Sequence, residues 1–92
     1  MLQLVTIDLS VADMLTFGAH ESRVLRLLNK YGGKVEFRVR ALDGTSETHL
    51  LAFPDAIAFN AFRIDPQRLE SQDEWIRSGA RVVSAAVRRI DG

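Results

Sequence analysis

The 92-residue sequence lacks cysteine, has only two prolines and carries no surplus of either charge. The absence of cysteine excludes disulfide bonds and thiolate metal sites, and it fits a reducing, cytoplasmic compartment. Twelve basic and twelve acidic residues cancel, so the chain has no net field to attract a polyanion such as nucleic acid or an acidic membrane surface. We therefore expect neither nucleic acid nor a membrane as a partner.

Long hydrophobic runs are missing as well. None approaches the ~20 residues that a transmembrane helix needs. The N-terminal stretch has no basic segment and carries Asp8 and Asp13 within its apolar part. That pattern is typical of a strand and not of a signal peptide.

The sequence also contains none of the short motifs that bind nucleotides or present an activated serine. Gly-x-Gly-x-x-Gly, Walker and Gly-x-Ser-x-Gly patterns are absent, so nucleotide-dependent chemistry and triad hydrolysis have no support. The two histidines, His20 and His49, stand 29 residues apart with no cysteine and no His-x-x-x-His spacing, which is a poor metal signature. We expect no metal ion and no cofactor.

The residues that are present indicate one globular domain spanning residues 1–92. Hydrophobic residues make up 47% of the chain and charged residues 26%, as in ordinary folded proteins. A domain this small buries only roughly 60–65% of the surface that its unfolded chain exposes. Association with a second copy would therefore add stability.

The first half of the chain predicts a strand, a helix and a hairpin. Residues 2–9 alternate with apolar side chains on both faces, which favours a central strand. Ser10 or Asp13 can cap the following helix, and Gly32 or Gly33 can end it in the left-handed conformation while the other turns the backbone without a Cβ clash. The strand after the glycines has Val35, Phe37 and Val39 on one side and Glu36, Arg38 and Arg40 on the other, as an edge strand with one polar face does. Asp43-Gly44 is a hairpin turn signal before a strand at 47–53.

The second half of the chain predicts two successive helices and a last strand. Pro54 and Asp55 end the hairpin and begin a helix, and Asp65-Pro66 begins another. The first of these helices has a short apolar stripe of Ile57, Ala58, Ala61 and Phe62, and the second carries the apolar residues Leu69, Ile76 and Ala80. Residues 81–90 form the last strand. The resulting order, β-α-β-β-α-β, is the ferredoxin-like α+β plan of a four-stranded antiparallel sheet with both helical regions on one face.

An uncovered sheet face follows from this plan. The first and third strands are apolar on both faces, so their outer face needs a partner. At ~25 cal/mol per Å² of apolar surface, burying a few hundred Å² would contribute several kcal/mol. We predict a homodimer that packs sheet to sheet.

Three segments carry a resemblance to a known family. "KYGGKVEFR", "LLAFPDAIAFNAF" and "DPQRLESQDEWIRSGARVV" resemble the Tyr-Gly-Gly, Phe-Pro and helix–Arg segments of the dimeric α/β-barrel proteins of domain-of-unknown-function family 1330. The resemblance spans nearly the whole chain in order and spacing. It implies a dimeric α/β barrel with a pocket between sheet and helices, and it implies no particular activity.

Both histidines are candidate acid–base groups, because imidazole titrates near neutral pH. His20 lies at the rim of the apolar stripe of the first helix, between Phe17 and Val24. His49 opens the third strand and could pair with His20 or Asp8. The alternative interpretation makes His20 a boundary residue and His49 a cross-strand packing residue.

Four further residues are candidate ligand contacts. Arg38 and Arg40 can bind a carboxylate in a bidentate way, and Tyr31 can offer its hydroxyl. Trp75 falls off the predicted stripe, where it can cover the pocket mouth. The alternatives are intersubunit or solvated arginines, a core tyrosine and a core-edge tryptophan.

The sequence thus favours a protein that binds a small organic molecule in a sheet–helix cleft. The alternative is a cofactor-independent monooxygenase- or isomerase-like enzyme, in which a histidine is the acid–base group. An RNA-recognition module shares the element order but stacks bases on aromatic residues of the central strands. Here those strands offer only Phe53, so we set that reading aside.

Overall fold

The structure, a computed structural model, describes residues 1–91, apart from the side chains of Gln72 and Asp73. The elements follow in the order β1 (Leu2–Asp8), α1 (Met14–Leu27), the 3-10 turn η1 (Leu28–Tyr31), β2 (Lys34–Arg40), β3 (Ser46–Ala52), α2 (Ala56–Arg63), α3 (Pro66–Glu70), α4 (Gln72–Ser78) and β4 (Arg81–Val87). Three short helices thus fill the place of the second helix of the β-α-β-β-α-β plan.

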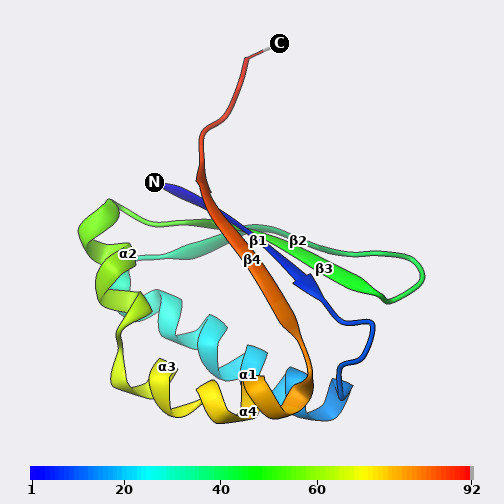
Figure 1. The fold of residues 1–92 in the computed structure, drawn as a ribbon. Coiled ribbons are helices and arrows are strands. Elements are labelled where there is room, and N and C mark those ends of the chain that lie inside the picture. Colours follow the sequence, from blue (N-terminus) through cyan, green and yellow to red (C-terminus); the bar gives the residue numbers. More distant parts are fainter. Residues whose placement is uncertain (92) are drawn as a thin grey trace.

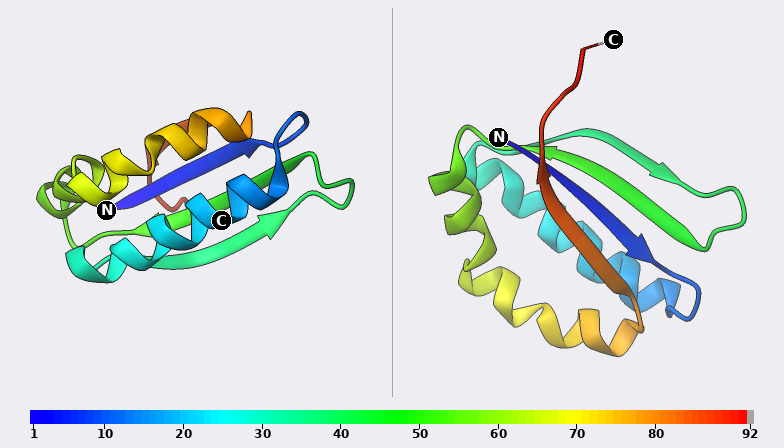
Figure 2. Two further views of the ribbon diagram at one scale, coloured as in Figure 1. Left: turned by 90° about the horizontal axis from the view of Figure 1, so that it is seen from below. Right: turned by 45° about the horizontal axis from the view of Figure 1, so that its top comes forward.

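The four strands form one antiparallel sheet in the order β2-β3-β1-β4. β1 and β3 are central, as their two apolar faces predicted, and β2 and β4 are the edges. The helices lie together on one face of the sheet (Figure 1). The two further views show α1 running across that face beside the α3–α4 segment (Figure 2). The predicted ferredoxin-like fold is confirmed.

The corner between α1 and β2 uses both glycines. Asp13 begins α1 by accepting a hydrogen bond from the Leu15 amide at 3.1 Å. Gly32 ends η1 in the left-handed conformation with φ of 70°, which costs a residue without Cβ little. A Cβ on Gly33 would lie 3.0 Å from the Phe53 ring. Both predicted roles, left-handed cap and close approach, are therefore confirmed.

The helical stretch after Pro54 begins where the sequence predicted but presents different residues to the interior. Asp55 and Asp65 cap α2 and α3. Ile57 and Ile76, however, are 80% and 67% exposed, so their places on the two predicted apolar stripes were wrong. In α4 the adjacent Trp75 packs against α1 instead. Consecutive helical residues point about 100° apart, so Ile76 is turned to the outside.

Strand β2 turns its polar side toward the helices. The register shifts between Val35, which pairs with Leu51, and Phe37, which pairs with Leu50. Such a bulge adds a residue on one strand and breaks the strict alternation, so the prediction that Val35 and Phe37 share a face was wrong. Beyond the bulge, Arg38 and Arg40 share the helix-covered face with His49 and Glu47, their partners in β3.

Strand β4 is shorter than predicted. It ends at Val87, opposite Leu2 at the start of β1, whereas the sequence suggested residues 81–90. Met1, the residue before Leu2, exchanges backbone hydrogen bonds with Phe53 on the β3 side of the sheet. Residues 88–91 leave the sheet as an extended arm (Figure 1).

The core between sheet and helices is divided into two apolar clusters. One consists of Leu27, Leu28, Leu51, Phe53 and Phe62. The other consists of Ile7, Leu9, Phe17 and Ala80. Buried polar side chains, among them Gln3, Glu21 and His49, lie on the same face of the sheet. The interior therefore has a polar region with apolar surroundings.

The opposite face of the sheet is open (Figure 1). By their register, Phe37, Val39, Val83 and Val87 belong to this face, with exposed fractions of 44%, 54%, 73% and 37%. In the part of the chain that the structure describes, no helix covers them.

Among the described residues, no helix is both long and apolar enough to cross a bilayer.

Candidate functional site

A cleft of about 470 Å³ separates the sheet from the helices. Its floor comes from β1, β3 and β4, and its walls come from α1, α2, α3 and α4. The apolar wall residues include Val24, Leu51, Phe59 and Trp75, and the polar lining consists of Gln3, His20, Glu21, His49, Arg63, Arg68 and Ser84. A largely apolar cavity with a few convergent polar groups is the usual form of a small-molecule site.

Glu47 is the electrostatic centre beside this cleft. Its side chain is 1% exposed and accepts hydrogen bonds from Arg38, from Arg40 Nη2 at 2.6 Å and from His49 Nε2 at 2.6 Å. Burial opposes ionisation of Glu47, but the hydrogen bonds from His49, Arg38 and Arg40 outweigh it and lower the pKa to about 2. Glu47 is therefore a carboxylate at neutral pH and holds His49 in place.

Glu21 reaches the same histidine from α1. Its Oε1 lies 3.1 Å from His49 Nε2. Burial raises the pKa of Glu21, while His49 and Arg38 act in the opposite direction. The carboxylates of Glu21 and Glu47, whose pKa values are shifted in opposite directions, thus flank the same nitrogen of His49. Environments that push the pKa values of two carboxyl groups apart are typical of acid–base sites. The Glu21–His49–Glu47 cluster can take up or release a proton at the cleft wall.

The same three residues have ligand atoms within 4.8 Å of one another, as a metal site would need. Both oxygens of Glu47 are already hydrogen-bonded to guanidinium groups or His49. A divalent cation would have to displace these donors and lie beside two positive charges. The donor set therefore fits proton transfer better than it fits metal binding.

His20 occupies a second position in the cleft. Its Nδ1 lies 3.0 Å from the Ser71 carbonyl oxygen, and its ring centroid lies 4.9 Å from that of Trp75 with the two rings tilted by 53°. Burial lowers the pKa of His20 and outweighs the carbonyl contact, which raises it. A neutral imidazole next to a carbonyl donates from Nδ1. Nε2 of His20 is then an acceptor.

The structure brings some of the predicted site residues together and separates others. His20, His49 and Trp75 line the cleft. Arg38 and Arg40 bind Glu47 and do not themselves line it. The Tyr31 hydroxyl donates to Asp65, which also accepts from Lys30 Nζ at 2.9 Å, so Tyr31 joins η1 to the start of α3.

Sequence reasoning missed Gln3, Glu21, Glu47, Arg63 and Arg68. The spacing of Glu47 and His49 already places them on one face of a strand. Glu21 had no comparable signal, because its contact with His49 depends on how α1 crosses the sheet. Asp8, the suggested partner of His49, instead accepts hydrogen bonds from Ser10.

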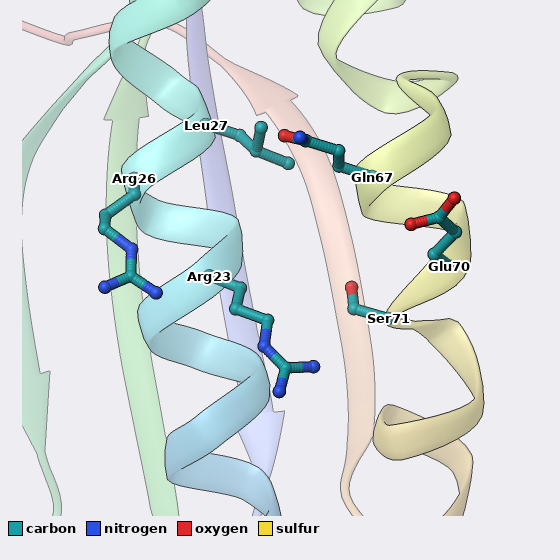
Figure 3. Close-up of a pocket in the computed structure, with 6 residues that line it drawn as sticks. All are labelled: Arg23, Arg26, Leu27, Gln67, Glu70 and Ser71. Atoms are coloured by element: carbon teal, nitrogen blue, oxygen red, sulfur yellow. The ribbon is translucent and has the colours of Figure 1, made fainter.

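A second hollow, of about 520 Å³, lies between α1 and α3 (Figure 3). Figure 3 shows Arg23 and Leu27 of α1 pointing toward the gap between the helices, with Gln67 on its other side. Their chain neighbours Val24, Leu28 and Arg68 line the cleft. The hollow and the cleft are thus both bounded by α1 and α3.

The four-stranded antiparallel sheet with its helices on one face is a ferredoxin-like α+β fold, and the cleft lies between the two layers. The chain matches no protein-family model and no curated protein. Among solved structures it is similar to SnoaB, a cofactor-independent oxygenase from Streptomyces nogalater, with 15% identity over 97% of this chain and 94% of that one and a TM-score of 0.70.

Two further solved structures share the fold. One is a dimeric ferredoxin-like protein of unknown function from Jannaschia sp., with 14% identity, coverage of 95% of this chain and 100% of that one, and a TM-score of 0.64. The other is an uncharacterised NIPSNAP domain protein from Burkholderia xenovorans, with 15% identity, coverage of 100% and 99%, and a TM-score of 0.65. At these identities the likeness confirms the fold and carries no activity with it.

Proposed function

We propose that the protein binds a small organic molecule in the cleft between sheet and helices and acts as a homodimer. The observation that carries the proposal is the cleft itself. It holds about 470 Å³ between apolar walls, and the buried polar groups Gln3, Glu21 and His49 converge on it. This volume lies within the usual range of small-molecule sites.

An unpaired polar atom supports a ligand at this place. Gln3 is 7% exposed and donates from Nε2 to Ser84, but among the described residues its buried Oε1 has no hydrogen-bond partner. A buried polar atom without a partner costs on the order of 1–3 kcal/mol. A bound molecule or an ordered water that donates to this oxygen would remove the cost.

The homodimer is supported by the open face of the sheet. Phe37, Val39, Val83 and Val87 leave apolar surface exposed on that face, and large apolar patches mark interaction surfaces in soluble proteins. A second copy offers the same patch by two-fold symmetry. Packing the two sheets together would bury this surface and leave each helix-covered cleft intact.

A neutral apolar probe tests the binding proposal. Trp75 is the one tryptophan of the chain and lines the cleft, so its fluorescence reports occupancy. We expect 1-adamantanecarboxamide, which does not absorb where tryptophan does, to bind with a dissociation constant in the millimolar range or below. Filling the cleft by Val24→Phe should weaken binding about tenfold or more.

Val11→Phe is the matched control, because Val11 is 75% exposed and does not line the cleft. It should bind the probe as the unsubstituted protein does. Circular dichroism shows whether each variant is folded. Absence of any fluorescence change with the unsubstituted protein, up to the solubility limit of the probe, contradicts the binding proposal.

The second candidate function is a cofactor-independent oxygenase, and the Glu21–His49–Glu47 cluster is the observation that favours it. In such a reaction a base removes a proton from an acidic C–H or O–H group, and the resulting anion donates electrons to dioxygen. The structurally similar SnoaB is described as a cofactor-independent oxygenase. His49 is the proposed base, with Glu47 fixing its orientation, and His20 is the second acid–base group.

Anthrone tests this candidate, because its methylene group is acidic and its anion reacts with dioxygen to give anthraquinone and water. We expect catalysed oxygen uptake in an oxygen electrode. His49→Gln should reduce the rate by about 100-fold, within the range for removal of a general base, and His20→Gln should reduce it less. Full activity in the variant with both substitutions would exclude the mechanism.

A further inference from the structure

The cleft carries an excess of positive charge on its helix side. Among the described titratable side chains that line it, Arg63 and Arg68 are cations, and Glu21 is the one carboxylate. Glu21 lies beside His49 on the opposite side, within the Glu21–His49–Glu47 cluster. The negative charge of that cluster is already balanced by Arg38 and Arg40.

Arg68 lacks a protein counter-ion among the described residues. Its guanidinium lies 5.6 Å above the Phe62 ring and donates one hydrogen bond, from Nη1 to the Arg63 carbonyl oxygen at 2.8 Å. A guanidinium has five N–H donors. Burial, and then the neighbouring charge of Arg63, lower the pKa of Arg68, as expected of a guanidinium that is partly removed from water beside another cation.

The sheet side of the cleft favours a hydrogen-bond donor and disfavours an anion. The unpartnered Oε1 of Gln3 accepts hydrogen bonds and repels an anion. A ligand with a carboxylate would therefore turn this group toward the helices, where the planar fork of a guanidinium matches the two carboxylate oxygens. Its apolar body would lie against Val24, Leu51 and Phe59.

We infer that the ligand of the cleft is an organic acid with a compact apolar body, whose carboxylate pairs with Arg68 and, at the mouth, with Arg63. The inference rests on the proposed function, because it names the chemical class of the molecule that the cleft binds. It also assigns Arg68 a role in selecting that class. Glu21 and His49 remain free for chemistry at the other side of the ligand.

A pair of probes that differ only in charge tests the inference. 1-Adamantanecarboxylate and 1-adamantanecarboxamide have the same apolar body and nearly the same polar head. We expect the carboxylate to bind the unsubstituted protein about tenfold more tightly than the carboxamide, the size of one charge-assisted hydrogen-bonded contact. Trp75 fluorescence and calorimetry measure both dissociation constants.

The Arg68→Gln variant should lose most of the preference for the carboxylate, because only the pairing with Arg63 at the mouth remains, whereas Arg68→Lys should keep more of it. Arg77→Gln is the matched control, because Arg77 is exposed on α4 and does not line the cleft; it should keep the full preference. Equal binding of both probes by the unsubstituted protein would overturn the organic-acid inference and leave the binding proposal standing. Binding of neither probe would overturn both.

Discussion

We expect the substitution Val83→Asp to convert the proposed homodimer into a monomer. Val83 is 73% exposed on the open face of β4. In an interface with two-fold symmetry each substitution occurs twice, so two carboxylates would enter an apolar contact without partners. The dimer dissociation constant should rise by at least roughly 100-fold, the equivalent of about 3 kcal/mol. Light scattering coupled to size-exclusion chromatography measures this change.

Val11→Asp supplies the control for this experiment. Val11 has nearly the same exposed fraction, 75%, but lies in the loop before α1 and not on the sheet. The control should stay dimeric, and both variants should keep the unsubstituted circular dichroism spectrum. A monomeric unsubstituted protein at micromolar concentration, or a Val83→Asp variant that remains dimeric, would contradict the proposed sheet-to-sheet contact.

The second large effect is expected at Glu47. The substitution Glu47→Leu removes the acceptor of hydrogen bonds from Arg38, Arg40 and His49 and leaves three donors without their partner. Removing one member of a buried ion pair costs about 3–5 kcal/mol. The arginine side chains are 42% and 47% exposed and can turn to solvent, so we expect a loss of about 3 kcal/mol in the free energy of unfolding. Urea unfolding at pH 7 tests this.

The loss in the free energy of unfolding caused by Glu47→Leu should become smaller as the pH falls. The pKa of Glu47 is about 2 in the folded protein and 4.5 as the ordinary value. A lowered folded-state pKa contributes stability above the unfolded-state pKa, and that contribution disappears as the pH falls toward the folded-state value. The free-energy difference between the unsubstituted protein and Glu47→Leu should therefore be largest above pH 5 and shrink between pH 5 and pH 2. Asp65 titrates in the same window, but it is present in both proteins and cancels.

Glu36→Leu is the comparison variant, because Glu36 forms ion pairs of 3.4 Å and 3.8 Å with Lys34 and Arg89, both well exposed. Screened pairs of this kind contribute at most about 1 kcal/mol. An equal loss of stability in the two variants, or a Glu47→Leu difference that does not change with pH, would show that Glu47 has no special role in the cluster.

The sequence by itself determined the order of the elements and the position of the sheet's central strands. Local signals suffice for this, because capping aspartates, glycines with positive φ and apolar alternation act within a few residues. Asp13, Gly32 and Asp65 take the local roles that their types and positions predicted. The apolar residues on both faces of β1 likewise placed it inside the sheet and indicated an open apolar face.

Only the tertiary structure decided which side chains meet in the cleft. The bulge in β2 sets which face its arginines share with Glu47, and no residue pattern in that strand announces it. The packing of α4 against α1 turned Trp75 inward and Ile76 outward. The contact between Glu21 and His49 joins residues of α1 and β3 that lie far apart in the chain. Such contacts depend on how a helix crosses the sheet, which is a property of the packed layers and not of any local stretch of sequence.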